Sequence, residues 1–308
     1  MKWRKLGLVY RPEGTYSWAK THAMIPTPVR INDDVIRVYI TCCDDQFIGR
    51  PGWVDLDAHN PLRVLDFSEQ CLLDVGRPGT FDENGVLACS VVQVDSQKYY
   101  MYYAGFEHGK KIRYRLLTGL AVSTDGGLTF RRYQETPVLE RSPGELYFRG
   151  GPFVIKEKAC YRLWYVSGSD WVTLSNKKKP VYNLKYLESP DGINWGSCGA
   201  PCLNITDDDE HGFGRPWVVK NSSDDYELFY SIRRKSLEGY RLGYARSNDG
   251  LSWDRRDNLM GLDVSEAGWD SEAIMYSAVI EAFGNKYCFY NGNNFGEDGF
   301  GVAICEEF

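Results

Sequence analysis

A short phrase built around Asp-Gly occurs three times in the chain, each time between two strand-like runs. Its Asp-Gly steps lie at 125–126, 191–192 and 249–250, with Ser two residues before each Asp and Phe or Trp soon after. The copies are about 60 residues apart, and a repeat of this period predicts one supersecondary unit used several times. The chain has room for about five units of this size.

Aromatic and β-branched runs recur at the same spacing, and helix signals are nearly absent. Each run has an apolar partner upstream and a further strand-like run before the next Asp-Gly step, which supplies the positive φ of a tight hairpin. We therefore predict an all-β fold, a single five-bladed β-propeller domain over residues 1–308 with four-stranded antiparallel blades. The runs assigned to the second strands are 35–41, 98–103, 161–166, 226–231 and 286–291.

The two ends of the chain are predicted to meet in the last blade. The run 300–305 reads as a third strand with no fourth strand after it. The run 3–10 begins with Trp followed by basic residues, like the outer strands that begin at Phe130 and Trp253. An N-terminal strand that completes the last blade would close the ring and remove an exposed sheet edge.

Composition narrows the classes of function. The net charge of −6 argues against a nucleic-acid partner, and no apolar run is long enough to span a bilayer. The N-terminus lacks the apolar core of a signal peptide. Nine cysteines without a Cys-x-x-Cys pair predict reduced thiols and a cytoplasmic location, with no metal site and no cofactor. The oligomeric state stays open.

Titratable side chains gather where a propeller carries its ligand sites, before the inner strands and after the second strands. Acids and bases at equivalent places in all five units suit acid–base chemistry. For a single residue, a solvated loop charge is an equally simple explanation. The candidates are Trp18, His22, Arg50, Asp82, Glu83, Arg149, Glu210, His211, Arg215, Asp270 and Glu272.

Two local phrases, at 210–218 and 268–276, together with the repeated Ser-x-Asp-Gly phrase, resemble the five-bladed propeller glycosidases. This superfamily includes glycoside hydrolase families 43, 32, 117 and 130, and the resemblance covers essentially the whole chain. Chains of similar sequence occur alongside genes of surface-polysaccharide biosynthesis. The chain departs from family 43 in its first inner strand, which opens with His22 where an Asp is expected. Where that family has a Glu-Gly-Pro phrase, this chain has Arg149-Gly150-Gly151-Pro152, with an arginine in place of the glutamate.

The resemblance implies that carboxylates from different blades act at the anomeric carbon of a saccharide. We expect Glu272 to be the proton donor and Asp82 the base or nucleophile. Glu210 would be a second catalytic carboxylate or would position Arg215. The other candidates would bind substrate, and Trp18, Trp171 and Trp217 would either stack on a sugar ring or pack in the core.

The basic candidates point to the substrate's charge. Arginine recognises carboxylate and phosphate with two parallel hydrogen bonds, so a basic pocket in an acidic protein favours an acidic sugar, a sugar phosphate or a nucleotide sugar. These arginines could instead pair with nearby carboxylates. A phosphorylase or transferase using the same pocket, and a sugar-binding propeller without catalysis, are the alternatives to a glycosidase.

Overall fold

The computed structural model describes residues 1–307, which consist mostly of β-strands. Helix in these residues is limited to two 3₁₀ turns, η1 (Asp257–Leu259) and η2 (Asn293–Phe295). The predicted all-β class is confirmed. Two compact units make up the chain. Unit 1 comprises Met1–Cys71, Trp217–Ile232 and the chain from Leu237 onward, and unit 2 comprises Leu72–Pro216 and Arg233–Ser236.

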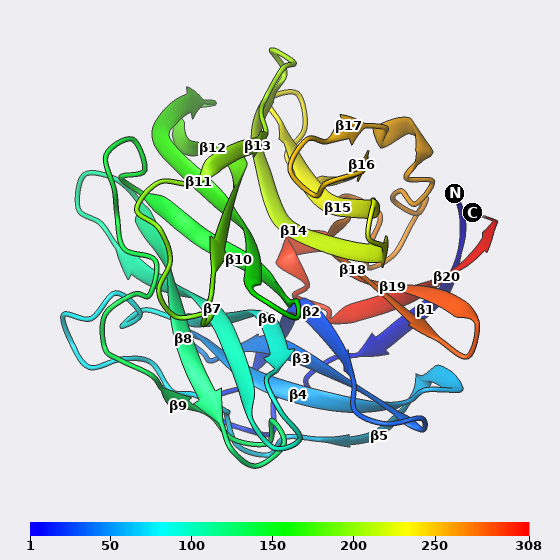
Figure 1. Cartoon of the computed structure of the whole chain (residues 1–308). Coiled ribbons are helices and arrows are strands. Elements are labelled where there is room, and N and C mark those ends of the chain that lie inside the picture. The colour runs from blue at the N-terminus through cyan, green and yellow to red at the C-terminus, as the bar shows by residue number, and fades with distance from the viewer. Residues whose placement is uncertain (308) are drawn as a thin grey trace. The chain divides into compact units, whose positions relative to one another are not determined.

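Unit 1 contains two four-stranded antiparallel sheets, with pairing orders β2-β3-β4-β5 and β1-β20-β19-β18 (Figure 1). It also holds most of β15 and all of β16 and β17, which pair in that order. The strands are β1 (Lys2–Tyr10), β2 (Thr21–Arg30), β3 (Val35–Cys43), β4 (Gly49–Asp57), β5 (Asn60–Phe67), β15 (Asp225–Arg234), β16 (Arg241–Ser247), β17 (Asp254–Arg255), β18 (Met275–Ala282), β19 (Asn285–Asn291) and β20 (Phe300–Glu307).

Unit 2 repeats the antiparallel pattern twice, and its groups are joined by short parallel contacts. Phe148 pairs with Leu116 between β10 and β8, and Tyr182 pairs with Gly212 between β12 and β14. The strands are β6 (Val86–Gln93), β7 (Tyr99–His108), β8 (Tyr114–Ser123), β9 (Arg131–Arg132), β10 (Phe148–Lys156), β11 (Tyr161–Leu174), β12 (Lys177–Ser189), β13 (Ala200–Leu203) and the part of β14 (Glu210–Ser222) up to Pro216.

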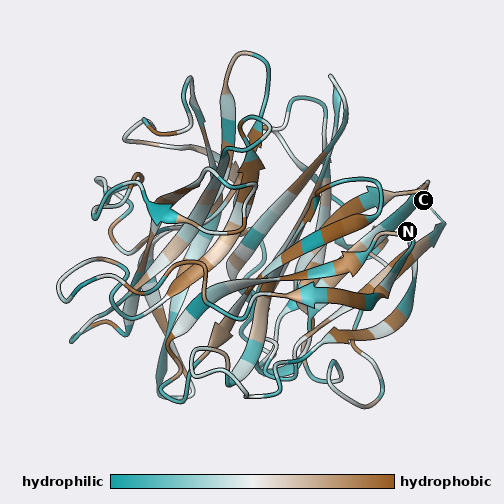
Figure 2. Ribbon diagram, turned by 90° about the horizontal axis from the view of Figure 1, so that it is seen from below, coloured by the Kyte–Doolittle hydropathy of each residue, from teal (hydrophilic) through white to brown (hydrophobic). Residues whose placement is uncertain are grey.

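The aromatic runs lie on strands whose residues are mostly buried, β3, β7, β11, β15 and β19. Tyr39, Tyr102, Trp164, Phe229 and Phe289, one from each strand, are fully buried. Figure 2 shows hydrophobic residues mainly on strands and hydrophilic residues in the connecting loops. The second-strand positions predicted from aromatic content are therefore where the core lies.

The N-terminal strand pairs with the last strand, as predicted. β1 runs antiparallel to β20, from Lys2 opposite Glu307 to Tyr10 opposite Phe300. The indole Nε1 of Trp3 donates a hydrogen bond to the Met260 carbonyl at 2.8 Å, which anchors the start of the chain inside unit 1.

The three Asp-Gly phrases form similar turns, of which the first, with a second Gly, is one residue longer. In the first, Asp125 Oδ1 accepts hydrogen bonds from the Ser123 hydroxyl at 2.7 Å and from the backbone N–H groups of Leu128 and Thr129. Gly126 has φ +77°, so a side chain at this position would be strained. Asp191 and Asp249 repeat these contacts with their own Ser and following N–H groups.

The outer strands differ in part from the prediction that each begins at the Phe or Trp of the repeat. β9 and β17 begin one residue after Phe130 and Trp253, but β13 begins only at Ala200, five residues after Trp195. The carbonyl of Gly196 in between accepts a hydrogen bond from Arg149 Nη2 at 3.0 Å. This segment is held by a side chain instead of by strand pairing, which explains the late start.

Candidate active site

A buried contact between a tyrosine, a carboxylate and a cation recurs in both units. In unit 2, Asp82 is completely buried, and its Oδ2 accepts hydrogen bonds from Tyr103 at 3.0 Å and Arg132 Nε at 2.7 Å. In unit 1, Asp270 Oδ2 accepts hydrogen bonds from Tyr290 at 3.0 Å and Lys5 at 2.6 Å. Because the partner cation offsets the cost of burying each carboxylate, both aspartates have a structural reason to be where they are.

Two further copies of this contact strengthen that explanation. Glu145 accepts hydrogen bonds from Tyr165 and Ser167 and pairs with Arg149 and Lys185. Asp257 accepts a hydrogen bond from Tyr230 and pairs with Arg255, two residues before it in the chain. Sequence reasoning missed these tyrosines, although each follows another aromatic or hydrophobic residue on a second strand.

Unit 1 contains a polar and aromatic cluster around the short turn η2. The side-chain oxygen of Asn293 accepts hydrogen bonds from the backbone N–H groups of Glu272 at 2.8 Å and Ala273 at 3.1 Å. Arg241 donates to the carbonyl of Glu272 at 2.9 Å. The backbone of Glu272 is thus held from both sides, while the residue itself is exposed to solvent.

Aromatic rings pack against the residues that follow Glu272 in the chain, as Tyr240 does with Ala273. Tyr240 contacts Phe295 edge-on at 6.3 Å between ring centroids and Tyr276 at 5.7 Å. Tyr276 is half-buried at the start of β18, and Phe295 is 41% exposed. We call Tyr240, Glu272, Tyr276, Phe295 and His22 the η2 cluster.

His22 enters the cluster from β2. Its N–H donates to the Glu297 carbonyl at 3.3 Å, its Nδ1 lies 2.8 Å from the Thr21 hydroxyl, and the Asn294 carbonyl faces its ring. Burial lowers the pKa of His22, which keeps the imidazole neutral near pH 7. His22 and Tyr276 both have positive φ, +63° and +58°, which is costly for side chains of this size and is common at functional sites.

Trp18 and Arg50 have packing roles in unit 1. The indole Nε1 of Trp18 donates to the Glu69 carbonyl at 3.0 Å, and the ring covers Gly52 so closely that a Cβ there would lie 2.4 Å from it. Arg50 pairs with Asp44 at 2.7 Å. Arg50 therefore pairs with a neighbouring carboxylate, which is the alternative to substrate binding.

Arg149 and Glu83 are likewise engaged within unit 2. Arg149 is 2% exposed, pairs with Glu145 at 3.1 Å and donates to the Glu140 and Gly196 carbonyls. Glu83 accepts a hydrogen bond from the Gly79 N–H at 2.7 Å. Both side chains stabilise the loops before β6 and β10.

The unit 2 part of β14 carries the remaining candidates, and all three are buried. The N–H of Glu210 donates to the Asp207 carbonyl at 3.0 Å, and Arg215 has φ +43°. His211 Nδ1 lies 2.9 Å from the Pro180 carbonyl. The pKa of His211 is lowered by burial and also by the positive charge of Arg233 nearby.

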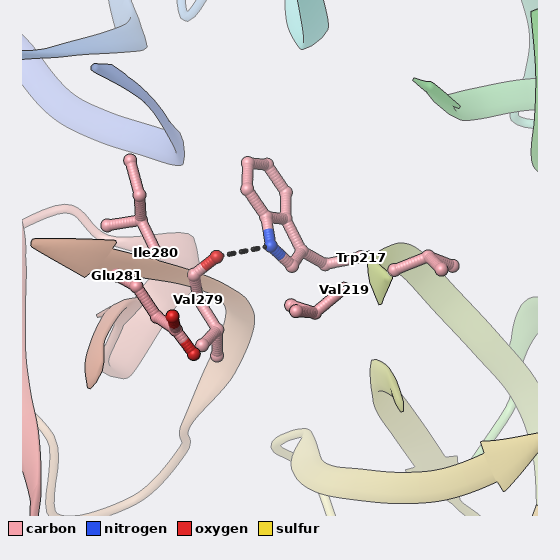
Figure 3. Close-up of a pocket in the computed structure, with 6 residues that line it drawn as sticks. Trp217, Val219, Val279, Ile280 and Glu281 are labelled. Carbon is pink, nitrogen blue, oxygen red and sulfur yellow. Dashed lines mark hydrogen bonds between the residues drawn. The ribbon is translucent and has the colours of Figure 1, made fainter. Parts of the chain in front are cut away.

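Trp217, which follows in the unit 1 part of β14, packs in the core. A cavity of about 260 Å³ beside it is lined by valine and isoleucine side chains and by Glu281 (Figure 3). Trp217 is 7% exposed, and its Nε1 donates to the Val279 carbonyl at 2.7 Å. A ring held in this way offers no free face to a sugar, so the packing alternative describes Trp217.

No group of three or more His, Cys, Asp or Glu side chains in residues 1–307 is arranged to hold a metal ion. Within the same residues, no helix has the length and apolar character needed to cross a bilayer. All nine cysteines are free thiols.

The chain has relatives along its whole length. A Mycobacterium tuberculosis protein named "Uncharacterized protein Rv1502" is 31% identical over 309 residues, which cover 99% of this chain and 100% of the relative. "Uncharacterized protein MT1551", from another strain of the same species, matches to the same extent. No protein-family model matches the sequence.

Solved structures share the fold. One described as "Glycoside hydrolase" has a TM-score of 0.75 at 20% identity and covers 99% of this chain and 92% of its own. A thermostable family-43 glycoside hydrolase has a TM-score of 0.67 at 18% identity, covering 94% and 92%. The Bombyx mori GH32 beta-fructofuranosidase BmSUC1 has a TM-score of 0.63 at 16% identity, covering 97% and 61%. The chain therefore has the fold of the glycoside hydrolase propellers, as its sequence resemblance predicted.

Proposed function

Because the chain belongs to the family of the mycobacterial proteins Rv1502 and MT1551 and has a glycoside hydrolase propeller fold, we propose that it is a glycosidase-like enzyme. It would act at the anomeric centre of a saccharide. The observation that carries the proposal is the η2 cluster, in which the backbone of exposed Glu272 is held by Asn293 and Arg241 and the rings of Tyr276 and Phe295 are partly exposed. A proton donor and faces on which sugar rings can stack are what such a reaction needs.

In this proposal Glu272 is the proton donor. Its carboxyl would protonate the leaving oxygen while Tyr276 and Phe295 contact the sugar. His22, neutral near pH 7, can donate or accept one hydrogen bond at a sugar hydroxyl. The constrained backbone of Glu272 limits the entropy lost when the carboxyl is placed against its substrate.

Two residues are candidates for the second carboxylate. Asp82 Oδ2 is occupied by Tyr103 and Arg132, and a similar contact with Tyr290 holds Asp270. Asp82 and Glu210 stay the two candidates for base or nucleophile. Asp270, held by Tyr290 and Lys5, is assigned to structural support.

The antiparallel groups of four support reading the chain as one five-bladed propeller domain with an N-terminal strand in the last blade. Nine free thiols support a cytoplasmic location, where an enzyme of polysaccharide biosynthesis would work. We propose an anionic saccharide as substrate, in keeping with the many cations of an otherwise acidic chain.

A sugar-binding protein without catalysis is the second candidate. It is favoured by His22 at the place of the family-43 aspartate and by the structural role of Asp82. Phosphorolysis is less well supported, because Arg50 and Arg149, two of the groups expected to hold phosphate, are already paired.

A proton-NMR time course with pooled neutral and acidic oligosaccharides, sugar phosphates and nucleotide sugars tests the proposal. We expect a new reducing-end anomeric signal without added phosphate, lost in Glu272→Gln and kept in Glu266→Gln, an exposed control in the same loop. Turnover only with phosphate would identify a phosphorylase. Line broadening without turnover would identify the binding protein and contradict the enzyme.

A further inference from the structure

Two hairpin ends in unit 2 converge on a strongly basic pocket. Its volume is about 360 Å³, and it lies between the β7–β8 and β11–β12 connections. Apart from Gly109 and Ile112, every residue that lines it is basic. The basic pocket is defined by Lys110, Lys111, Arg113, Lys177, Lys178 and Lys179.

The charges of the basic pocket are not neutralised by protein carboxylates. Within residues 1–307, none of its six cations forms an ion pair with an Asp or Glu, and no carboxylate lines it. Several cations elsewhere in this unit are paired, for example Arg132 with Asp82 and Arg149 with Glu145. Gathering like charges costs electrostatic energy, and in a chain of net charge −6 this is not a consequence of overall composition.

Aromatic rings continue from the basic pocket along both hairpins. The Arg113 guanidinium lies 6.0 Å from the ring centroid of Tyr114, which stacks on Phe106 at 4.7 Å and meets Trp171 edge-on at 5.6 Å. All three rings are half-buried. On the other hairpin, Lys179 pairs with Val172, the residue after Trp171.

We propose that the basic pocket and the adjacent rings of Tyr114 and Trp171 bind an acidic oligosaccharide. The cations would hold its carboxylate or phosphate groups, and the rings would contact the apolar faces of its sugars. The choice of a saccharide over other polyanions rests on the proposed function. The binding itself needs no catalysis, because the lysines of the basic pocket lie outside the η2 cluster.

The proposal places the recognition of anionic groups in the basic pocket. The arginines first considered for it, Arg50 and Arg149, are occupied by carboxylates. Lys177–Lys179 are joined by cations from a second hairpin 64 or more residues earlier in the chain. Convergence of two separate basic segments is what distinguishes the pocket from an ordinary exposed loop.

Isothermal titration calorimetry of full-length protein carrying Glu272→Gln tests the proposal, since this variant separates binding from turnover. The probes are an oligogalacturonate hexamer, maltohexaose carrying phosphate monoesters, and neutral maltohexaose. The variant Lys111→Gln/Lys178→Gln removes one exposed charge from each hairpin, and Lys158→Gln, exposed in the β10–β11 turn, is the control.

We expect one or both acidic probes to bind and the neutral probe to bind at least about tenfold more weakly. Each removed charge should weaken acidic binding by up to about fivefold, and the control should not change it. Binding should also weaken as salt rises from 50 to 500 mM. The stronger of the two acidic probes identifies the anionic group.

Equal affinity for acidic and neutral probes, or an unchanged affinity in the double variant, would overturn the inference. Binding of a DNA duplex or of phosphatidylserine vesicles in place of both acidic probes would overturn its choice of ligand. Turnover in the NMR experiment together with no binding here would refute the basic pocket alone. Binding here without turnover would leave the inference standing and contradict the enzyme.

Discussion

Replacing Arg132 with methionine would expose the structural role of Asp82. Arg132 Nε donates to Asp82 Oδ2 at 2.7 Å, and another guanidinium nitrogen donates to the Asp74 carbonyl. Methionine keeps much of the apolar volume but removes the charge. Asp82 would then be a fully buried carboxylate whose only remaining side-chain donor within residues 1–307 is Tyr103.

The size of the effect follows from burial. Removing one partner of a buried ion pair costs about 3–5 kcal/mol in the free energy of unfolding. The Arg132 side chain is 20% exposed, so part of its charge is already solvated and we expect a value near the lower limit, about 3 kcal/mol. For a chain of this length that lowers the melting temperature by about 4–6 °C.

Thermal and urea unfolding followed by circular dichroism measure this change, with Arg131→Met as the control because Arg131 is exposed. Adding Asp82→Asn to Arg132→Met should recover at least about 1 kcal/mol, since the buried charge is then gone. If Arg132→Met is as stable as Arg131→Met, the ion pair does not stabilise the fold. If Asp82→Asn abolishes turnover at unchanged stability, Asp82 is catalytic and its role is not limited to supporting the fold.

Further predictions concern the repeated turn and a buried histidine. Although partial burial opposes it, hydrogen bonds from Ser123 and Thr129 lower the pKa of Asp125 to about 2, so its stabilisation is complete above pH 4 and is lost as pH falls to 2. Asp125→Ala should lower the free energy of unfolding in urea at pH 7 by about 2–3 kcal/mol and should make stability less dependent on pH between 4 and 2. A decrease below about 0.5 kcal/mol would contradict this prediction. Burial lowers the pKa of His211, so the unfolded chain takes up a proton first and stability falls as pH drops below about 6.5. His211→Gln should flatten this slope between pH 5 and 7, and an unchanged slope would refute the assignment.

Much of the fold could be predicted from local patterns. The period of the Asp-Gly phrase located the turns, and aromatic runs located the buried strands, because both depend on residues close together in sequence. The late start of β13 could not be predicted, since it depends on Arg149 reaching Gly196 from another strand.

The candidate site was harder to predict for the same reason. Asp82 and Asp270 carry the residue type that catalysis needs, but their partners Arg132 and Lys5 lie 50 and 265 residues away in the chain. Glu272 was identified from its position before an inner strand. The rings of Tyr240 and Phe295 in the η2 cluster were missed, because nothing in their local sequence separates them from core aromatics.

The most direct test of the account is the leaving-group dependence of Glu272→Gln, measured on the sugar that the NMR survey identifies. A general acid contributes about 10²–10⁴-fold to the rate when the leaving oxygen needs a proton, and little when it does not. We predict that turnover of an alkyl glycoside falls by this amount, while a 2,4-dinitrophenyl glycoside is cleaved at close to the wild-type rate. Equal losses on both substrates, or no loss on either, would contradict the role of Glu272 as the proton donor.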